Sequence, residues 1–368
     1  MKGLYIHIPF CIKKCKYCDF NSGAAPDGVK EEYINALIRE MAEYKGAELD
    51  TVYIGGGTPT ALNTELLAEL LKSIKCSFTL SKDIEFTVEM NPKTADREKL
   101  AMMHKMGVNR LSIGVQSFCD TELEALGRVH SAQDAKEAIA LAKEAGFENI
   151  SIDLMSGIPK QTEESFLKTL NTAILQEPDH ISCYSLILEE GTLLFDEVKS
   201  GKTALCDEDT ERRLYDLAVD TLGKNGYKQY EISNFAKDGK ASRHNIKYWT
   251  MEEYIGLGIS AHSFLNGVRF SNTDDLKGYC QNDTKIRNKE PLTKEDMMSE
   301  FVFLGLRMIC GISQTDFFKK FGEDIFEIFQ KPLEKFIKTG FLLYENGRIR
   351  LSKKAVSVSN QIMCEFLL

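Results

Sequence analysis

The sequence predicts an α/β protein: a partial (β/α)6 barrel followed by a small C-terminal α+β domain with a winged-helix-like shape. From Leu4 to about Ser185, short β-rich runs alternate with longer helical patterns, as in parallel sheets. Near the C-terminus, two amphipathic helical patterns precede a short hairpin. We therefore expect a barrel over residues 1–235, a connecting segment over 236–290 and a second domain over 291–368.

The barrel elements are identified from their periodicity. Strands are expected at residues 4–8, 51–54, 85–90, 110–115, 149–154 and 180–185, with a further strand at 227–232. Helices are expected at 29–44, 64–75, 94–106, 134–145 and 163–175. Because reactive groups of parallel barrels gather at the carboxyl ends of the strands, residues that follow these strands should meet at one mouth.

The segment after the barrel has a different pattern. Polar residues over 272–290 predict a connector. Helices are expected at 294–310 and 315–339, and a hairpin at 341–351 turns at Asn346-Gly347. Residues 291–368 hold 11 Lys and Arg against 10 Asp and Glu, so packing or partner docking is favoured over DNA recognition.

The net charge and the cysteine usage further narrow the class of protein. The net charge of −9 argues against a nucleic-acid partner. Ten cysteines in 368 residues, seven of them scattered singly, do not form a disulfide scaffold, and no apolar run reaches the length of a membrane span. We expect a cytoplasmic protein. The acidic charge gives no support to peripheral membrane association, and the sequence leaves open whether the protein forms a homodimer.

The triplet Cys11-x3-Cys15-x2-Cys18 carries the most functional information. Three thiolates can hold a [4Fe-4S] cluster while one iron stays open to a substrate or cofactor. The alternatives are a structural zinc site and three unrelated core thiols. Zinc would normally have a fourth Cys or His nearby.

This triplet resembles that of the radical S-adenosylmethionine (SAM) superfamily, in which SAM chelates the open iron. Further segments resemble, in order, one subgroup of that superfamily: the oxygen-independent coproporphyrinogen III oxidases (HemN type) and the HemW-type haem chaperones. The matching segments lie at residues 5–11, 55–60, 89–92, 110–118, 126–130 and 153–159.

The resemblance implies a set of SAM contacts. Glu89 and Asp153 end apolar strands, where a charge needs a partner or a ligand. The alternative for each polar residue is an ordinary salt bridge or cap, for the glycines a tight turn, and for the tyrosines a place in the core. The residues expected to bind SAM are Tyr5, Tyr17, Gly56, Gly57, Thr58, Glu89, Gln116, Arg128 and Asp153.

A second motif lies in the connecting segment. The run His244-Asn245-x-x-Tyr248-Trp249 resembles the haem-binding motif of the HemW-type chaperones, which implies that these four residues contact haem and that His244 can ligate its iron. The alternative is a buried Trp249 anchor with His244 bonded to the backbone. His262 is a second candidate for the iron, or a structural residue.

Two departures distinguish this chain from the coproporphyrinogen oxidases. Those enzymes continue the triplet to Cys-x-Cys, whereas Asp19-Phe20 follows Cys18 here, and they carry a long segment before the first strand, which here begins at about residue 4. The resemblance therefore favours a haem chaperone that passes haem to an acceptor haemoprotein, such as a respiratory one. The alternatives are a coproporphyrinogen III oxidase and a radical SAM methylase or ring-opening enzyme acting on haem.

Overall fold

The computed structural model describes residues 1–281 and 286–368, and its centre is a mixed sheet of twelve described strands. The strand order is β12-β11-β10-β9-β1-β2-β3-β4-β5-β6-β8-β7. The strands are β1 (Lys2–Ile8), β2 (Glu48–Gly56), β3 (Thr79–Met90), β4 (Arg110–Gln116), β5 (Ile150–Ser156), β6 (His180–Ser185), β7 (Lys228–Glu231), β8 (Asn234–Ala236), β9 (Tyr254–Leu257), β10 (His262–Leu265), β11 (Val268–Asn272) and β12 (Ile286–Pro291).

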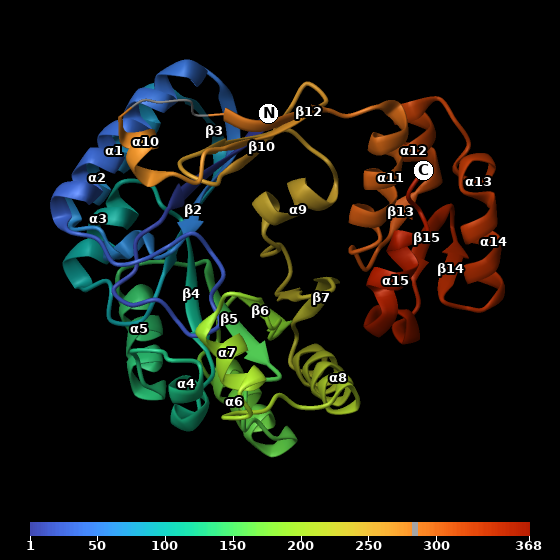
Figure 1. Ribbon diagram of the computed structural model, residues 1–368, viewed down its shortest axis with the longest axis horizontal. Helices are drawn as coiled ribbons and strands as arrows, with labels where there is room; N and C mark the ends of the chain where they lie inside the picture. Colours follow the sequence, from blue (N-terminus) through green and yellow to red (C-terminus); the bar gives the residue numbers. More distant parts are fainter. Residues whose placement is uncertain (282–285) are drawn as a thin grey trace.

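Strands β1 to β6 form the parallel part of the sheet, so the predicted partial (β/α)6 barrel is confirmed. Every residue of β4 is buried, as expected of a strand covered on both faces. The helices of this part wrap around the curved sheet (Figure 1). They are α1 (Asp27–Met41), α2 (Thr64–Ser77), α3 (Arg97–Lys105), α4 (Asp120–Ala125), α5 (Ala132–Glu144), α6 (Glu163–Leu175), α7 (Leu193–Lys199) and α8 (Glu208–Lys224), with short 3-10 turns at Ala42–Tyr44 and Pro59–Ala61.

Helix α2 illustrates why these segments form and pack as they do. The Asn63 side chain accepts a hydrogen bond from the Leu66 backbone N–H at 2.8 Å, which caps the first turn. Leucines at positions three and four apart then bury one face against the sheet. The core of the barrel is continuous through these helices and the parallel strands.

The flank from β9 to β12 was not expected from the sequence. Strand β9 pairs in parallel with β1, and β10, β11 and β12 follow in antiparallel order. The predicted connector over 272–290 is wrong where described, because part of β11, helix α10 (Leu276–Cys280) and β12 lie there. The rest of that connector, residues 282–285, lies outside the described residues. The β10–β11 turn uses Asn266 and Gly267, both with positive φ, a hairpin signal that the sequence carries.

The C-terminal lobe has its own apolar core and lies beside the barrel (Figure 1). Its small sheet, β13 (Ile312–Ser313), β15 (Arg348–Leu351) and β14 (Leu342–Glu345), contains the predicted hairpin, and Asn346 and Gly347 both have positive φ. The single helix predicted over 315–339 is wrong, because Gly322 turns left-handed and Asp324 caps a new helix. The helices are α11 (Lys294–Gly305), α12 (Gln314–Phe321), α13 (Ile325–Ile328), α14 (Gln330–Lys338) and α15 (Ser359–Cys364), with a 3-10 turn at Lys353–Val358.

The helices are short throughout. The longest one described, α8, has 17 residues. In the described ranges, no helix combines the length and the apolar character that crossing a membrane requires.

Candidate functional site: a cofactor cavity and an aromatic cleft

A cavity of about 330 Å3 opens at the mouth of the parallel strands. The loops that follow β1, β2 and β4 and the ends of β3 and β5 form its wall, as expected for parallel barrels. Ten residues predicted for the cluster and SAM meet there, although they are far apart in the sequence. They are Cys11, Cys15, Tyr17, Cys18, Gly56, Gly57, Glu89, Gln116, Arg128 and Asp153.

The three predicted cluster ligands are free, half-buried thiols on one wall of this cavity. The loop that carries them is fixed by a backbone hydrogen bond from Lys16 to Leu126 at 3.0 Å. The Arg128 guanidinium donates to the Cys15 Sγ at 3.4 Å, and the Thr58 hydroxyl donates to the Cys11 Sγ at 3.5 Å. Donors aimed at sulfur favour thiolates, which are the ligands of iron–sulfur clusters.

The donor set of this cavity is three thiols with cationic neighbours. Among the residues that the structure describes, no three His, Cys, Asp or Glu side chains gather closely enough to hold one ion. The thiols nevertheless share a cavity with an arginine and two lysines, Lys13 and Lys14. Cationic neighbours of this kind stabilise the negative charge of thiolate-bound clusters.

Glu89 is a partly buried acid at the end of β3 that faces the cavity. Its carboxylate accepts hydrogen bonds from the Tyr53 hydroxyl at 2.6 Å and from the Gly56 backbone N–H at 3.1 Å. Burial raises the pKa of Glu89 to about 7. Among the residues that the structure describes, Arg110 acts on this acid electrostatically but forms no ion pair with it, so a ligand with an ammonium group could supply a direct partner.

Asp153 lies in β5, also facing the cavity. It accepts a hydrogen bond from the Ser112 hydroxyl at 3.2 Å, and burial raises its pKa above the ordinary range. A carboxylate held in this way can accept hydrogen bonds from the hydroxyls of a ligand.

Arg128 and Gln116 complete the polar wall. The Arg128 guanidinium donates to the Asn91 Oδ1 at 2.6 Å, and its buried Nε has no hydrogen-bond partner in the described part of the chain. Gln116 adopts a left-handed backbone (φ 66°) where β4 ends, and its Oε1 accepts from the Tyr184 hydroxyl at 3.0 Å. A non-glycine residue in that conformation is held there by its surroundings, which is common at functional sites.

Gly56 shows why the triple glycine is needed in this loop. Its φ is 105°, and a Cβ there would overlap the ring of His7. The loop therefore passes directly over β1, close to the carboxylate of Glu89.

Two predicted SAM residues do not line the cavity. Tyr5 faces the neighbouring cleft, where its hydroxyl lies 3.0 Å from the Nδ1 of His7. Thr58 is buried, and its hydroxyl connects two side chains: it accepts a hydrogen bond from the Asn91 Nδ2 at 2.7 Å and donates one to the Cys11 Sγ. Thr58 is thus placed to position the Cys11 thiol, and its contact with SAM stays a prediction.

Sequence reasoning missed several residues of the cavity wall. Ser112, Gly114 and Gln116 occupy every second position of β4, and Ser182 and Tyr184 do the same in β6. Residues with this period of two share one face of a strand, here the face that lines the cavity. That signal was available in the sequence once the strand ends were known. The missed residues are Tyr53, Asn91, Ser112, Gly114, Ser182 and Tyr184.

A second, larger hollow of about 690 Å3, called the aromatic cleft below, lies beside the cofactor cavity. Its wall on the sheet comes from β1, β9, β10 and β11, and its other wall from helix α9 (Arg243–Trp249), the residues that follow it, and α11. Its volume lies within the range typical of small-molecule sites. The residues that line it are Tyr5, His7, Phe20, Asn21, Gly56, Glu89, Tyr248, Trp249, Met251, Glu252, Tyr254, Ser260, His262, Phe264, Arg269, Glu300, Phe303 and Leu304.

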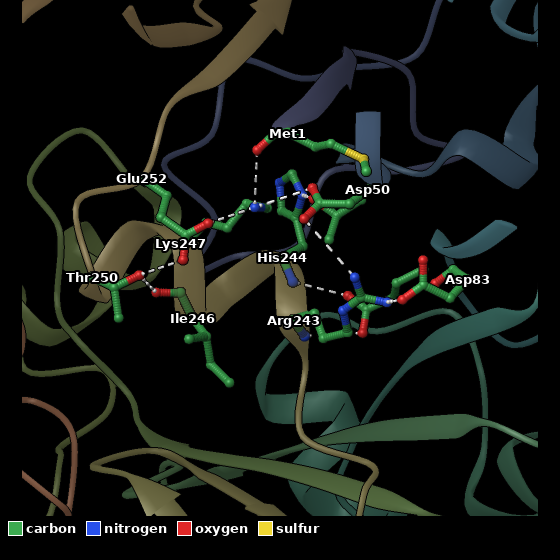
Figure 2. Close-up of polar contacts among 11 residues, drawn as sticks. Met1, Asp50, Asp83, Arg243, His244, Ile246, Lys247, Thr250 and Glu252 are labelled. Carbon is green, nitrogen blue, oxygen red and sulfur yellow. Dashed lines mark hydrogen bonds and ion pairs between the residues drawn. The ribbon is translucent and has the colours of Figure 1, made fainter. Parts of the chain in front are cut away.

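Helix α9, which carries the predicted haem motif, is tied firmly to the barrel (Figure 2). Lys247 is buried and pairs with Asp50 of β2 at 3.0 Å and with Glu252 at 2.6 Å. The carboxylate of Glu85 in β3 accepts from the backbone N–H groups of Arg243 and His244, both at 2.9 Å. An acid at the N-terminus of a helix also complements the helix dipole.

His244 is buried inside this arrangement and does not face the cleft. Its Nδ1 lies 2.9 Å from the Thr51 hydroxyl and its Nε2 lies 2.8 Å from the Tyr248 hydroxyl. Its ring stacks on Tyr53 with centroids 5.2 Å apart, and burial lowers its pKa to about 3. Both ring nitrogens of His244 are engaged in this arrangement, which favours a structural role, and its ligation of the haem iron stays a prediction.

The other three residues of the motif also differ in whether they line the cleft. Asn245 does not line the cleft; its backbone N–H bonds to the capping hydroxyl of Ser242. Tyr248 and Trp249 do line it. The Trp249 ring lies under the Arg307 guanidinium, 4.4 Å from its centroid, and its buried Nε1 has no hydrogen-bond partner in the ranges that the structure describes.

Two family models match this chain. The family model described as "Radical SAM superfamily" matches residues 5–173, and the one described as "HemN C-terminal domain" matches residues 292–358. A protein named "Heme chaperone HemW" from Bacillus subtilis is 38% identical and covers 100% of this chain and 99% of its own. The chain belongs to the HemW family of radical SAM proteins.

Other members of this family have similar lengths. The Escherichia coli protein named "Heme chaperone HemW" is 36% identical over 92% of this chain and 91% of its own length. Among solved structures, coproporphyrinogen III oxidase (HemN) from Escherichia coli has a TM-score of 0.87 at 24% identity and covers 99% of this chain and 89% of its own. That likeness shows that this chain shares the fold of HemN.

Proposed function

We propose that this chain is a haem chaperone that binds haem in the aromatic cleft and passes it to an acceptor haemoprotein in the cytoplasm or at the membrane surface. The observation that carries the proposal is the position of the cleft. A hollow of about 690 Å3 with aromatic walls adjoins the cavity of the three cysteines. Family membership supports it, because relatives of nearly equal length are named haem chaperones.

The cofactor cavity would hold a [4Fe-4S] cluster on Cys11, Cys15 and Cys18, with SAM against the open iron. Bound there, cluster and SAM supply an electron and a sulfonium that can be cleaved. The protein's part is to bind and orient SAM. The list of residues that would do so is Tyr17, Gly56, Gly57, Glu89, Gln116, Arg128 and Asp153.

The charges of the cavity match the polar groups of SAM. Glu89, which has no ion-pair partner among the described residues, would pair with the methionyl ammonium, and Asp153 would accept from the ribose hydroxyls. Arg128, with an unpartnered Nε, would face the methionyl carboxylate. Burial of these groups excludes water, so each interaction is stronger than it would be at the surface.

A second candidate function is that of a coproporphyrinogen III oxidase, which the fold of HemN favours. One experiment separates the two. Cluster-loaded protein is incubated without oxygen with SAM, dithionite and coproporphyrinogen III, and tetrapyrroles and 5′-deoxyadenosine are measured by mass spectrometry. Intact coproporphyrinogen together with SAM cleavage supports the chaperone, and protoporphyrinogen formation overturns it.

The chaperone itself is tested by binding and transfer. Titration with hemin should give a saturable Soret band, and mixing the loaded protein with an apo-haemoprotein should move that band to the acceptor. Failure of the wild-type chain to bind hemin would contradict the proposal. Loss of the haem band with SAM and reductant would indicate an enzyme that modifies haem.

A further inference from the structure

His262 stands out in the aromatic cleft because its imidazole is free. Two histidines line the cleft among the described residues, His7 and His262. His7 has both nitrogens engaged, with the Tyr5 hydroxyl at 3.0 Å and the Asn21 carbonyl at 3.1 Å. The side chain of His262 is exposed, and neither ring nitrogen has a hydrogen-bond partner within the described part of the protein.

The position of His262 on its strand points it into the cleft. In β10, side chains alternate between the two faces of the sheet, and Ser263 is fully buried on the other face. Phe264 lies on the same face as His262 and pairs in register with Tyr254 of β9. The imidazole therefore stands at the edge of a flat aromatic floor.

The opposite wall is also aromatic. Tyr248 and Trp249 of α9 belong to it, and the Tyr248 ring meets Tyr254 of the sheet wall edge to face, with centroids 4.7 Å apart, where the two walls join. Phe303 and Leu304 of α11 extend this wall. Flat apolar surfaces on both sides suit the macrocycle of haem, while a single exposed imidazole suits its iron.

The electrostatic surroundings keep the ring in its ligating form. Partial burial of the ring and the nearby Arg269 cation lower the pKa of His262, which favours the neutral imidazole. Arg269 itself is held by Glu300 at 2.5 Å and lies over the Phe264 ring at 5.2 Å. A neutral imidazole is the form that binds haem iron.

We propose that His262, and not His244, is the axial ligand of the haem iron in this protein. The inference rests on the proposed function, because it assumes that haem occupies the aromatic cleft. It also gives the two sides of the cleft different tasks. The sheet wall provides the ligand, and α9 provides the contact surface of Tyr248 and Trp249.

The test is a hemin titration of the cluster-loaded full chain and two variants, read by absorbance and by electron paramagnetic resonance. In His262→Ala the histidine-ligated spectrum should be lost and the affinity for hemin should fall by about tenfold or more. Added imidazole should restore the spectrum by filling the place of the missing ring. Iron and sulfide content, equal to that of the wild type, shows that the variant is folded.

The matched control is His244→Ala, in which the histidine-ligated spectrum should persist. A histidine-ligated spectrum that survives in His262→Ala, or that is lost in a folded His244→Ala, would overturn the assignment of His262 and leave the chaperone proposal standing. A wild-type chain that binds no hemin would overturn the proposed function itself, so the two failures are distinguishable.

Discussion

The cofactor cavity and helix α9 differ in what their polar side chains contact. In the cavity, Glu89 and Arg128 are partly buried, line the wall and retain capacity for further bonds. On α9, His244 and Lys247 are more deeply buried and are satisfied by Thr51, Tyr248, Asp50 and Glu252. Both regions stand out in the sequence through short motifs. The comparison shows that a motif marks polar side chains that need specific partners. Whether those side chains bind a ligand or stabilise the fold depends on how much hydrogen-bonding capacity the protein leaves unused.

The largest effect is expected at the cysteines. Cys15→Ser should abolish the cluster after anaerobic reconstitution, because its thiolate lies at the centre of the triplet and accepts from Arg128. Iron and sulfide analysis and the broad visible absorbance measure the loss. The matched control is Cys76→Ser, an exposed thiol on α2, which should reconstitute normally. A full cluster in Cys15→Ser would show that the cavity is not the cluster site.

On the α9 side, His244→Ala should destabilise the fold. Two buried hydrogen bonds and the ring volume are lost, which costs about 2–4 kcal/mol of the free energy of unfolding. Urea unfolding followed by circular dichroism measures the change. His104→Ala, an exposed histidine on α3, should change stability by less than about 0.5 kcal/mol. Unchanged stability in His244→Ala would remove the distinction between the two regions.

Glu89 predicts a pH dependence of SAM binding. Its raised pKa of about 7 means that below pH 7 the acid is mostly protonated and attracts an ammonium weakly, whereas above pH 7 it is a carboxylate. SAM affinity should therefore rise about tenfold between about pH 6 and about pH 8. Calorimetric titration of the cluster-loaded protein measures it.

Glu89→Gln should bind SAM about tenfold to a hundredfold more weakly and show a flat pH profile. The exposed Glu69→Gln on α2 should retain the wild-type profile. A steep profile that persists in Glu89→Gln would assign the titration to another group.

The smallest effect is expected at Tyr184. Tyr184→Phe removes one hydrogen bond to Gln116, which costs about 1 kcal/mol, or roughly fivefold in SAM affinity. The same titration measures it, and cluster content should not change. An affinity equal to that of the wild type would show that Gln116 is held by its backbone alone.

The barrel was predictable because its strands and helices have strong, distinct periods. The acids at the ends of β3 and β5 were predictable too, since a charge after an apolar run is conspicuous. Ser112 and Ser182 were missed because a neutral polar residue inside a buried strand gives no such signal.

Two differences between the sequence-based predictions and the structure have clear physical causes. The flank from β9 to β12 was missed because its strands are short and hairpin-linked and lack the crossover helices of the rest. The role of His244 could not be inferred from sequence, because an imidazole among aromatic residues has the same pattern whether it binds iron or two hydroxyls.

The cofactor cavity and the aromatic cleft share a partition made of Phe20, Gly56 and Glu89, since all three residues line both hollows. If SAM and haem bind as proposed and both touch Glu89, their binding would be linked, and SAM would change the affinity for haem by the same factor by which haem changes the affinity for SAM. Haem binding in the cleft would thus change SAM binding in the cofactor cavity without any movement of a domain.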